Sequence, residues 1–143
     1  STVRPMSTTS AALTINASAE DIWDVVIDFD SWTEWDSGMS FMEQVDDKVR
    51  FRADVAPERV VRMKIASADE PHRLVLTGGL PLGLFRATRT IEIEPSGKGC
   101  RVTISESIGG LIRAFVRSPP TLEPSFQLWC SGLQREVKRR SRG

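Results

Sequence analysis

Arg89 and Glu106 are the two residues of this sequence whose types and positions best suit chemistry. The sequence SGKG at residues 96–99 predicts a two-residue β-hairpin turn between strands that alternate apolar and polar residues. In the register that this turn sets, Arg89 lies opposite Glu106, and Ile91 lies opposite Ile104 on the same face. A guanidinium and a carboxyl group therefore share the inward face of the predicted hairpin, where both can act on one bound molecule.

A buried ion pair is costly, and this cost predicts the surroundings of Arg89 and Glu106. Desolvation in a dry core costs several kcal/mol per ion, which the mutual attraction need not recover. We therefore expect the pair to border a wet, partly polar cavity. A register shifted by one residue would instead turn both groups to solvent, and this alternative stays open.

Other catalytic and metal-binding arrangements are missing from the sequence. His72 is the one histidine, and it follows Pro71 in a predicted turn, where a solvated surface role is expected. Cys100 and Cys130 cannot form a disulfide framework or a Cys/His zinc cluster, so we expect free thiols and no metal site. A Ser/His/Asp or Cys/His arrangement and a glycine-rich phosphate loop are also missing, and we predict no cofactor.

Composition predicts one small domain without a strongly charged partner. We expect a flexible segment at residues 1–9, a single domain at 10–140 and a basic tail at 141–143. Lys plus Arg and Asp plus Glu both number 19, so we expect no nucleic-acid partner. No segment has the apolar length of a membrane span, and no signal-peptide pattern opens the sequence. We therefore expect a cytoplasmic protein without stable membrane insertion, as a monomer or a homodimer.

Period-two alternation predicts that most of the chain is β-strand. A short strand at residues 10–16 precedes a helix that Ser18 caps and that continues to Phe29, and a second short helix follows in the segment SWTEW. Further strands are predicted at residues 39–45, 49–55, 60–66, 73–78, 84–94 and 101–108. Since these strands have one apolar and one charged face, they fit an antiparallel meander that is covered on a single side.

The last long amphipathic segment, Thr121 to Arg140, is the predicted cover for that sheet. Its apolar residues recur at steps of three and four and form one stripe: Leu122, Phe126, Trp129, Cys130, Leu133 and Val137. A gap between this stripe and the sheet would be a ligand cavity. The predicted fold class is therefore α+β: a curved antiparallel sheet of about seven strands wrapped around a long C-terminal helix, with two short helices after the first strand.

This order of elements is the helix-grip (Bet v 1-like) arrangement, and two stretches of the sequence resemble a known family. Leu13 to Trp35, LTINASAEDIWDVVIDFDSWTEW, resembles the opening of the START-like superfamily, especially its polyketide cyclase/dehydrase-like branch, also called SRPBCC. Gly79 to Ile112 resembles a later segment of the same branch, in which a glycine and a phenylalanine precede a strand, a hairpin and a glutamate. The superfamily includes lipid carriers, hormone receptors, plant allergens and aromatase/cyclases, so the resemblance specifies the fold more than the function.

The resemblance implies a deep cavity between the sheet and the long helix that holds a small, largely apolar molecule. Trp35 and Phe85 match aromatic positions of the motif, and Glu106 matches its acidic position. Arg89 stands where many relatives have a histidine, and this departure argues against a histidine general base. Trp32 and Trp35 point inward from one helical turn, either as core residues or as the mouth of the pocket. The predicted ligand-binding residues are Trp32, Trp35, Phe51, Met63, Leu76, Phe85, Ile91, Ile104, Phe126, Trp129 and Cys130.

Two functions from different classes fit these residues. In the first, the domain is a cofactor-independent enzyme of secondary metabolism that promotes the cyclisation or dehydration of a polyketide- or terpenoid-like molecule. Arg89 would then polarise a carbonyl or stabilise an enolate, and Glu106 would orient Arg89 or shuttle a proton. In the second, the domain is a non-catalytic carrier in which Arg89 recognises a carboxylate or hydroxyl group. A third reading is a protein-interaction module with no enclosed cavity.

Overall fold

A computed structural model describes residues 7–54, 60–80, 85–109 and 123–142. Within these ranges, seven antiparallel strands form one sheet in the order β1-β7-β6-β5-β4-β3-β2. The strands are β1 (Ser7–Ile15), β2 (Met39–Val45), β3 (Lys48–Ala53), β4 (Val61–Asp69), β5 (Arg73–Leu80), β6 (Phe85–Ser96) and β7 (Gly99–Gly109). The helical elements are α1 (Ala19–Val26), the 3-10 turn η1 (Phe29–Ser31), α2 (Trp32–Trp35) and α3 (Glu123–Arg142).

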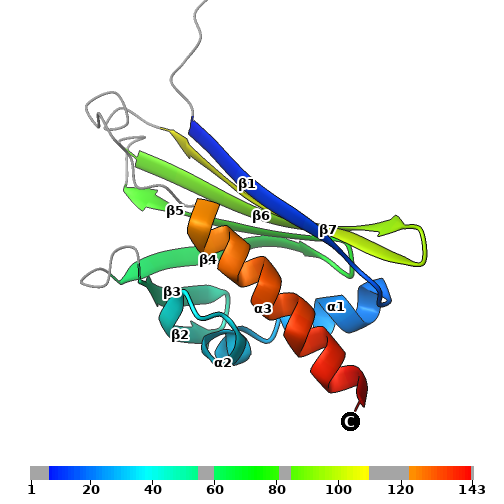
Figure 1. Ribbon diagram of the computed structural model, residues 1–143. Helices are drawn as coiled ribbons and strands as arrows, with labels where there is room; N and C mark the ends of the chain where they lie inside the picture. The colour runs from blue at the N-terminus through cyan, green and yellow to red at the C-terminus, as the bar shows by residue number, and fades with distance from the viewer. Residues whose placement is uncertain (1–6, 55–59, 81–84, 110–122, 143) are drawn as a thin grey trace, which may run out of the picture.

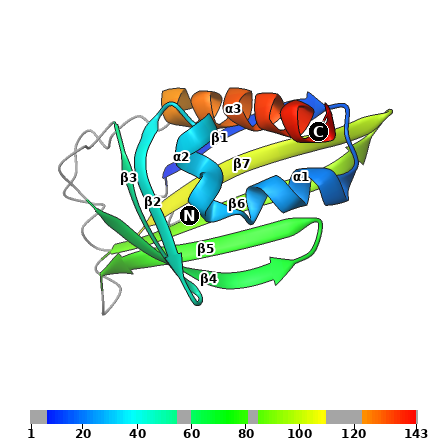
Figure 2. The same ribbon diagram turned by 90° about the horizontal axis from the view of Figure 1, so that it is seen from below.

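The sheet is curled, and α3 runs along its inner face (Figure 1). Seen from below, α1 and α2 lie beside α3 on the same side of the sheet (Figure 2). Helix α3 packs against β1 and α1, which are far from it in sequence. This arrangement confirms the predicted helix-grip fold. No helix in the described ranges is long and apolar enough to cross a membrane.

The first helix is capped as predicted but is shorter than predicted. The Ser18 hydroxyl oxygen accepts a hydrogen bond from the Asp21 backbone N–H at 3.1 Å, and this bond satisfies one of the unpaired amides at the helix start. The prediction of a continuous helix to Phe29 is wrong, because α1 ends at Val26 and Phe29 begins η1. Phe29 is nevertheless buried, since the 3-10 turn keeps its side chain on the inner side.

The hairpin between β6 and β7 has the predicted register. Gly97 has a φ of 59°, a left-handed conformation that glycine adopts without steric cost. The strands then pair Ile91 with Ile104 and Arg89 with Glu106. The alternative register, shifted by one residue, is therefore excluded.

The core lies between the sheet and α3. The predicted stripe of α3 is buried at every position that the structure describes, namely Phe126, Trp129, Cys130, Leu133 and Val137. Leu122 and the predicted helix start at Thr121 lie outside the described residues.

Helix α3 approaches α2 closely at Gly132. A Cβ atom on Gly132 would lie 2.0 Å from the Trp35 carbonyl oxygen, far inside van der Waals contact. Only a residue without a side chain fits between these backbones. Gly132 therefore sets the distance between α3 and the end of α2, where the candidate site begins.

Candidate functional site

Arg89 and Glu106 form a buried ion pair on the inner face of the sheet. The Arg89 Nε–H donates to Glu106 Oε1 at 2.8 Å. The two residues are only 8% and 7% exposed. Because the carboxyl group fixes one edge of the guanidinium, the pair presents an oriented cation from the middle of β6.

Two aromatic rings lie against the Arg89 guanidinium. Its central carbon is 5.0 Å from the centroid of Phe51 on β3 and 5.2 Å from the centroid of Phe126 on α3. The negative faces of aromatic rings attract cations at this distance, and more strongly where water is excluded. The arginine is thus held by one strand, by the neighbouring carboxyl group and by a ring from each of two other elements.

A small cavity of about 30 Å³ lies beside this arginine. Its lining comes from the segment after α2, from β2, β3, β6 and β7, and from the first turns of α3: Asp36, Gly38, Met39, Phe51, Arg89, Ile104, Ser125, Phe126 and Trp129. This volume holds about one water molecule. It is far below the several hundred Å³ typical of ligand pockets, because aromatic side chains fill the space between α3 and the sheet.

Asp36 is a site residue that the sequence analysis missed. It ends α2, lines the cavity together with Arg89, and is 4% exposed. The Gly38 backbone N–H donates to its Oδ1 at 2.9 Å. Burial raises the pKa of Asp36, while the Gly38 hydrogen bond and the Arg89 charge partly oppose that rise. The available signal was an acidic residue directly after the tryptophan pair, at a helix end.

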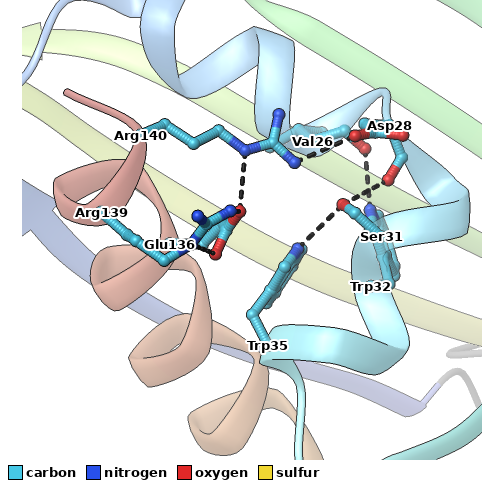
Figure 3. Close-up of polar contacts among 8 residues, drawn as sticks. All are labelled: Val26, Asp28, Ser31, Trp32, Trp35, Glu136, Arg139 and Arg140. Atoms are coloured by element: carbon cyan, nitrogen blue, oxygen red, sulfur yellow. Dashed lines mark hydrogen bonds and ion pairs between the residues drawn. The ribbon is translucent and has the colours of Figure 1, made fainter. Parts of the chain in front are cut away.

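Three tryptophans form a cluster on one side of the cavity. Trp129 meets Trp32 and Trp35 edge to face, with ring centroids 5.6 Å and 5.8 Å apart. The Trp32 indole N–H donates to the Val26 carbonyl at 3.0 Å, and the Trp35 indole N–H donates to the Ser31 hydroxyl at 3.1 Å (Figure 3). The buried Nε1 of Trp129, by contrast, has no hydrogen-bond partner among the described residues. A buried donor without a partner is costly, and Trp129 is also one of the residues that line the cavity.

The predicted site residues differ in where the structure places them. Those that line the cavity are Phe51, Arg89, Ile104, Phe126 and Trp129. Those that are buried in the core without lining it are Trp32, Trp35, Met63, Leu76, Ile91 and Cys130. Glu106 contacts Arg89 but does not line the cavity. Phe85 opens β6, and its side chain lies outside the described part of the chain.

The cysteine nearest this site is not a ready nucleophile. Burial, with a smaller contribution from the Asp36 charge, raises the pKa of Cys130 to about 11. Because the thiolate is the reactive form, a thiol with this pKa is nearly unreactive at neutral pH. No three or more His, Cys, Asp and Glu side chains in the described ranges are grouped to hold a metal ion. The polar side chains that line the cavity are therefore those of Arg89, Asp36, Ser125 and Trp129.

The curled sheet, the long helix α3 and the short helices after β1 make up a helix-grip domain. The chain belongs to the family described as polyketide cyclase / dehydrase and lipid transport, whose model matches residues 6–140. This match confirms the resemblance seen in the sequence. A family of this description handles small, largely apolar molecules.

Solved structures with the same fold share little sequence with this chain. A START-superfamily protein from Mycobacterium smegmatis has a TM-score of 0.73 at 13% identity, over 93% of this chain and 98% of its own. The ZhuI aromatase/cyclase from Streptomyces sp. R1128 has a TM-score of 0.73 at 13% identity, over 96% and 97%. Norcoclaurine synthase from Thalictrum flavum, in complex with a transition-state analogue, has a TM-score of 0.74 at 18% identity, over 99% of both chains. A search of curated protein sequences found no match.

Proposed function

We propose that this protein binds a small, largely apolar molecule, polyketide- or terpenoid-like, between the sheet and α3 and promotes its cyclisation or dehydration. The observation that carries the proposal is the buried Arg89, which lines the cavity while Glu106 and two aromatic rings hold it in place. Family membership supports the same class of ligand.

Arg89 is the group that acts on the ligand in this proposal. A fixed cation in a water-poor site stabilises negative charge that develops on a carbonyl or enolate oxygen, without the reorganisation that water would need. Glu106 serves as a positioning residue, since it contacts Arg89 but not the cavity. In a molecule that carries a ketone, aldol cyclisation and the dehydration that follows it both pass through an enolate or a polarised carbonyl, so one oriented cation serves either reaction.

Ligand binding requires the aromatic side chains to move. The cavity of about 30 Å³ is smaller than a single aromatic ring, and its walls include Phe126 and Trp129 from α3. Changes of side-chain rotamer at a binding site are common even where the backbone moves little. We therefore expect a bound ligand to displace one of these rings and to keep its oxygen beside Arg89.

Binding is tested with a matched pair of ligands. Benzylideneacetone carries an apolar ring and a carbonyl group, and its analogue with CH₂ in place of C=O lacks the oxygen. Isothermal titration calorimetry should show about tenfold tighter binding of the ketone, which is the typical value of a hydrogen bond to a charged group. Arg89→Lys should remove most of that preference, because an ammonium cannot reproduce the oriented guanidinium.

Arg86→Lys is the control for this experiment. Arg86 lies three residues earlier on β6 and is exposed, so its replacement should leave the ligand preference unchanged. Equal affinity of the wild-type protein for the two ligands would contradict the role of Arg89.

A non-catalytic carrier is the second candidate, and the cavity's largely apolar lining together with the lipid-transport part of the family description favours it. The rate at which the aldol of benzaldehyde and acetone loses water distinguishes the two functions. The product of this dehydration is benzylideneacetone, whose strong ultraviolet absorbance reports the rate. An enzyme accelerates this loss above the rate in buffer. A carrier binds the ketone and leaves the rate at its background value.

A further inference from the structure

Asp36 faces the same cavity as Arg89 from another element. The carboxyl group comes from the end of α2, and the guanidinium comes from β6 in the sheet. Oδ1 of Asp36 is held by the Gly38 N–H, so the orientation of the carboxyl group is fixed. A molecule in this space would therefore lie between a carboxyl group and a cation.

Asp36 has no cation of its own among the described groups around the cavity, whereas an ordinary buried carboxylate is paired with one. Arg89 already pairs with Glu106, so Asp36 is a second carboxyl group near one arginine. The other titratable groups that act on Asp36 are Asp54 and Cys130, and neither supplies a positive charge. The hydrogen bond from the Gly38 N–H does not require an aspartate at position 36, because the side-chain oxygen of an asparagine would accept it equally well.

We propose that Asp36 is the acid–base residue of this cavity and that the substrate class is a β-hydroxy ketone with an apolar ring. This inference rests on the proposed function, in which Arg89 binds the ketone oxygen. The carboxyl group of Asp36 then meets the hydrogen on the carbon between the ketone and the hydroxyl-bearing carbon. The ring of the substrate packs among Phe51, Phe126 and Trp129.

The reaction balances with one carboxylate. Asp36 removes the proton from the central carbon, and the electron pair of that C–H bond forms an enolate whose oxygen lies at Arg89. The enolate collapses, the bond between carbon and the hydroxyl oxygen breaks, and the same proton passes from Asp36 to the departing oxygen. The products are an unsaturated ketone and water, and Asp36 is a carboxylate again, so no other reactant is needed.

The raised pKa of Asp36 suits this cycle once the geometry is in place. A carboxyl group whose pKa lies above its ordinary 3.8 is a stronger base when ionised and remains able to return the proton. Since the ionised form must start the cycle, the rate should rise with pH through the pKa of Asp36 and then level off.

The test is the dehydration of the aldol of benzaldehyde and acetone by the folded, full-length protein. Asp36→Asn keeps the size of the side chain and an acceptor for the Gly38 N–H, and it should lower kcat/KM by about 100-fold or more. It should also abolish the rising limb of the pH profile while benzylideneacetone still binds. Asp30→Asn, at an exposed aspartate in η1, is the matched control and should leave both measurements unchanged.

Each outcome of this test decides between the two proposals. If Asp36→Asn retains the wild-type rate and pH profile, the inference about Asp36 is overturned and the proposed function stands. If the wild-type protein binds benzylideneacetone without accelerating the dehydration, the inference and the catalytic half of the proposed function both fail, and the carrier remains. If benzylideneacetone does not bind at all, the proposed binding function is overturned as well.

Discussion

The two halves of α3 differ in whether their buried polar groups have hydrogen-bond partners among the described residues. In the C-terminal half, the buried Glu136 carboxylate accepts hydrogen bonds from Arg139 at 2.8 Å and 2.6 Å and from Arg140 at 2.8 Å. Arg140 also donates to Asp28 after α1 at 2.9 Å, which ties the helix end to the rest of the molecule (Figure 3). In the N-terminal half, the Trp129 indole N–H has no partner in the described ranges, and Trp129 lines the cavity.

The C-terminal half of α3 therefore anchors the helix, and the N-terminal half forms part of the candidate binding site. A satisfied polar network lowers the energy of one arrangement and fixes the helix there. Residues that line a cavity can instead contact a bound molecule, so their replacement changes binding as well as packing. The contrast predicts that changes in the cavity half will affect ligand binding and stability together, whereas changes in the anchored half will affect stability alone.

The largest expected effect is at the buried ion pair. Arg89→Met leaves the Glu106 carboxyl group buried without its cation, and it should lower the free energy of unfolding by about 3–5 kcal/mol in urea denaturation. The double variant Arg89→Met, Glu106→Leu should recover most of that loss, because no unpaired charge remains. Arg139→Met is the comparison in the anchored half, where Arg140 still pairs with the carboxylate. Equal costs for the two arginine variants would contradict the expectation that the buried pair stabilises the protein more than the network in which the Arg139 side chain is 71% exposed.

Gly132→Ala should disturb both halves, since this residue lies between them. The added Cβ would be 2.0 Å from the Trp35 carbonyl oxygen, so the two backbones must separate. We expect a loss of about 3 kcal/mol in the free energy of unfolding, the upper range for overpacking, and a weaker affinity for benzylideneacetone. Ser131→Ala at the exposed neighbouring position is the control. Helix propensity alone predicts that Gly132→Ala stabilises by about 1 kcal/mol, and a rise in Tm would refute the close-approach argument.

Two identical substitutions within the tryptophan cluster sharpen the comparison. Trp32→Phe removes a satisfied N–H and leaves the Val26 carbonyl without its donor, whereas Trp129→Phe removes an N–H that has no described partner. Both tryptophans are buried, so the loss of packing is similar. Trp32→Phe should therefore be less stable than Trp129→Phe by about 1–2 kcal/mol in urea denaturation. For binding of benzylideneacetone the order should reverse, with the larger loss in Trp129→Phe.

The smallest expected effect is at the anchored network, and it depends on pH. Hydrogen bonds from Arg139, opposed by burial and assisted by Arg140, lower the pKa of Glu136 from 4.5 to about 2. Its stabilisation is therefore complete above pH 4.5 and is lost as the pH falls through 2. Since the Arg139 side chain is 71% exposed, solvent screens the pair, and Glu136→Gln should cost about 1 kcal/mol at neutral pH. Thermal unfolding at pH 7 and below pH 2 measures this, and the difference between variant and wild type should vanish in acid.

Local sequence patterns were enough to predict much of the site's framework. The facing of Arg89 and Glu106 follows from a hairpin whose turn lies within seven residues of both, as SGKG sets the register of the strands it joins. The buried stripe of α3 follows from apolar spacing alone. The same spacing led to an error at Phe29, because apolar periodicity continues through η1 although the helix hydrogen bonds do not.

Asp36 and the size of the cavity could not be predicted in the same way. Asp36 looks like a solvated residue at a helix end, and it becomes a site residue only because Arg89 and Trp129, far away in the chain, surround it. The cavity is small because several tryptophans and phenylalanines meet there from separate elements. The spacing of residues within one segment does not predict how completely aromatic rings from several segments fill the space between them.

The sequence by itself determined the helix-grip order of elements, the curled sheet with one apolar face, the stripe of α3 and the inward pairing of Arg89 with Glu106. These features depend on contacts between near neighbours or on periodicity, which a single chain encodes directly. Tertiary structure alone decided that ion pairs at Glu136 anchor one end of α3, that Trp129 near the other end lines a cavity, and that Asp36 shares this cavity with Arg89. It also decided that Gly132 sets the distance between α3 and the end of α2. Those features depend on the approach of distant segments, and their energies exist only once the chain has folded.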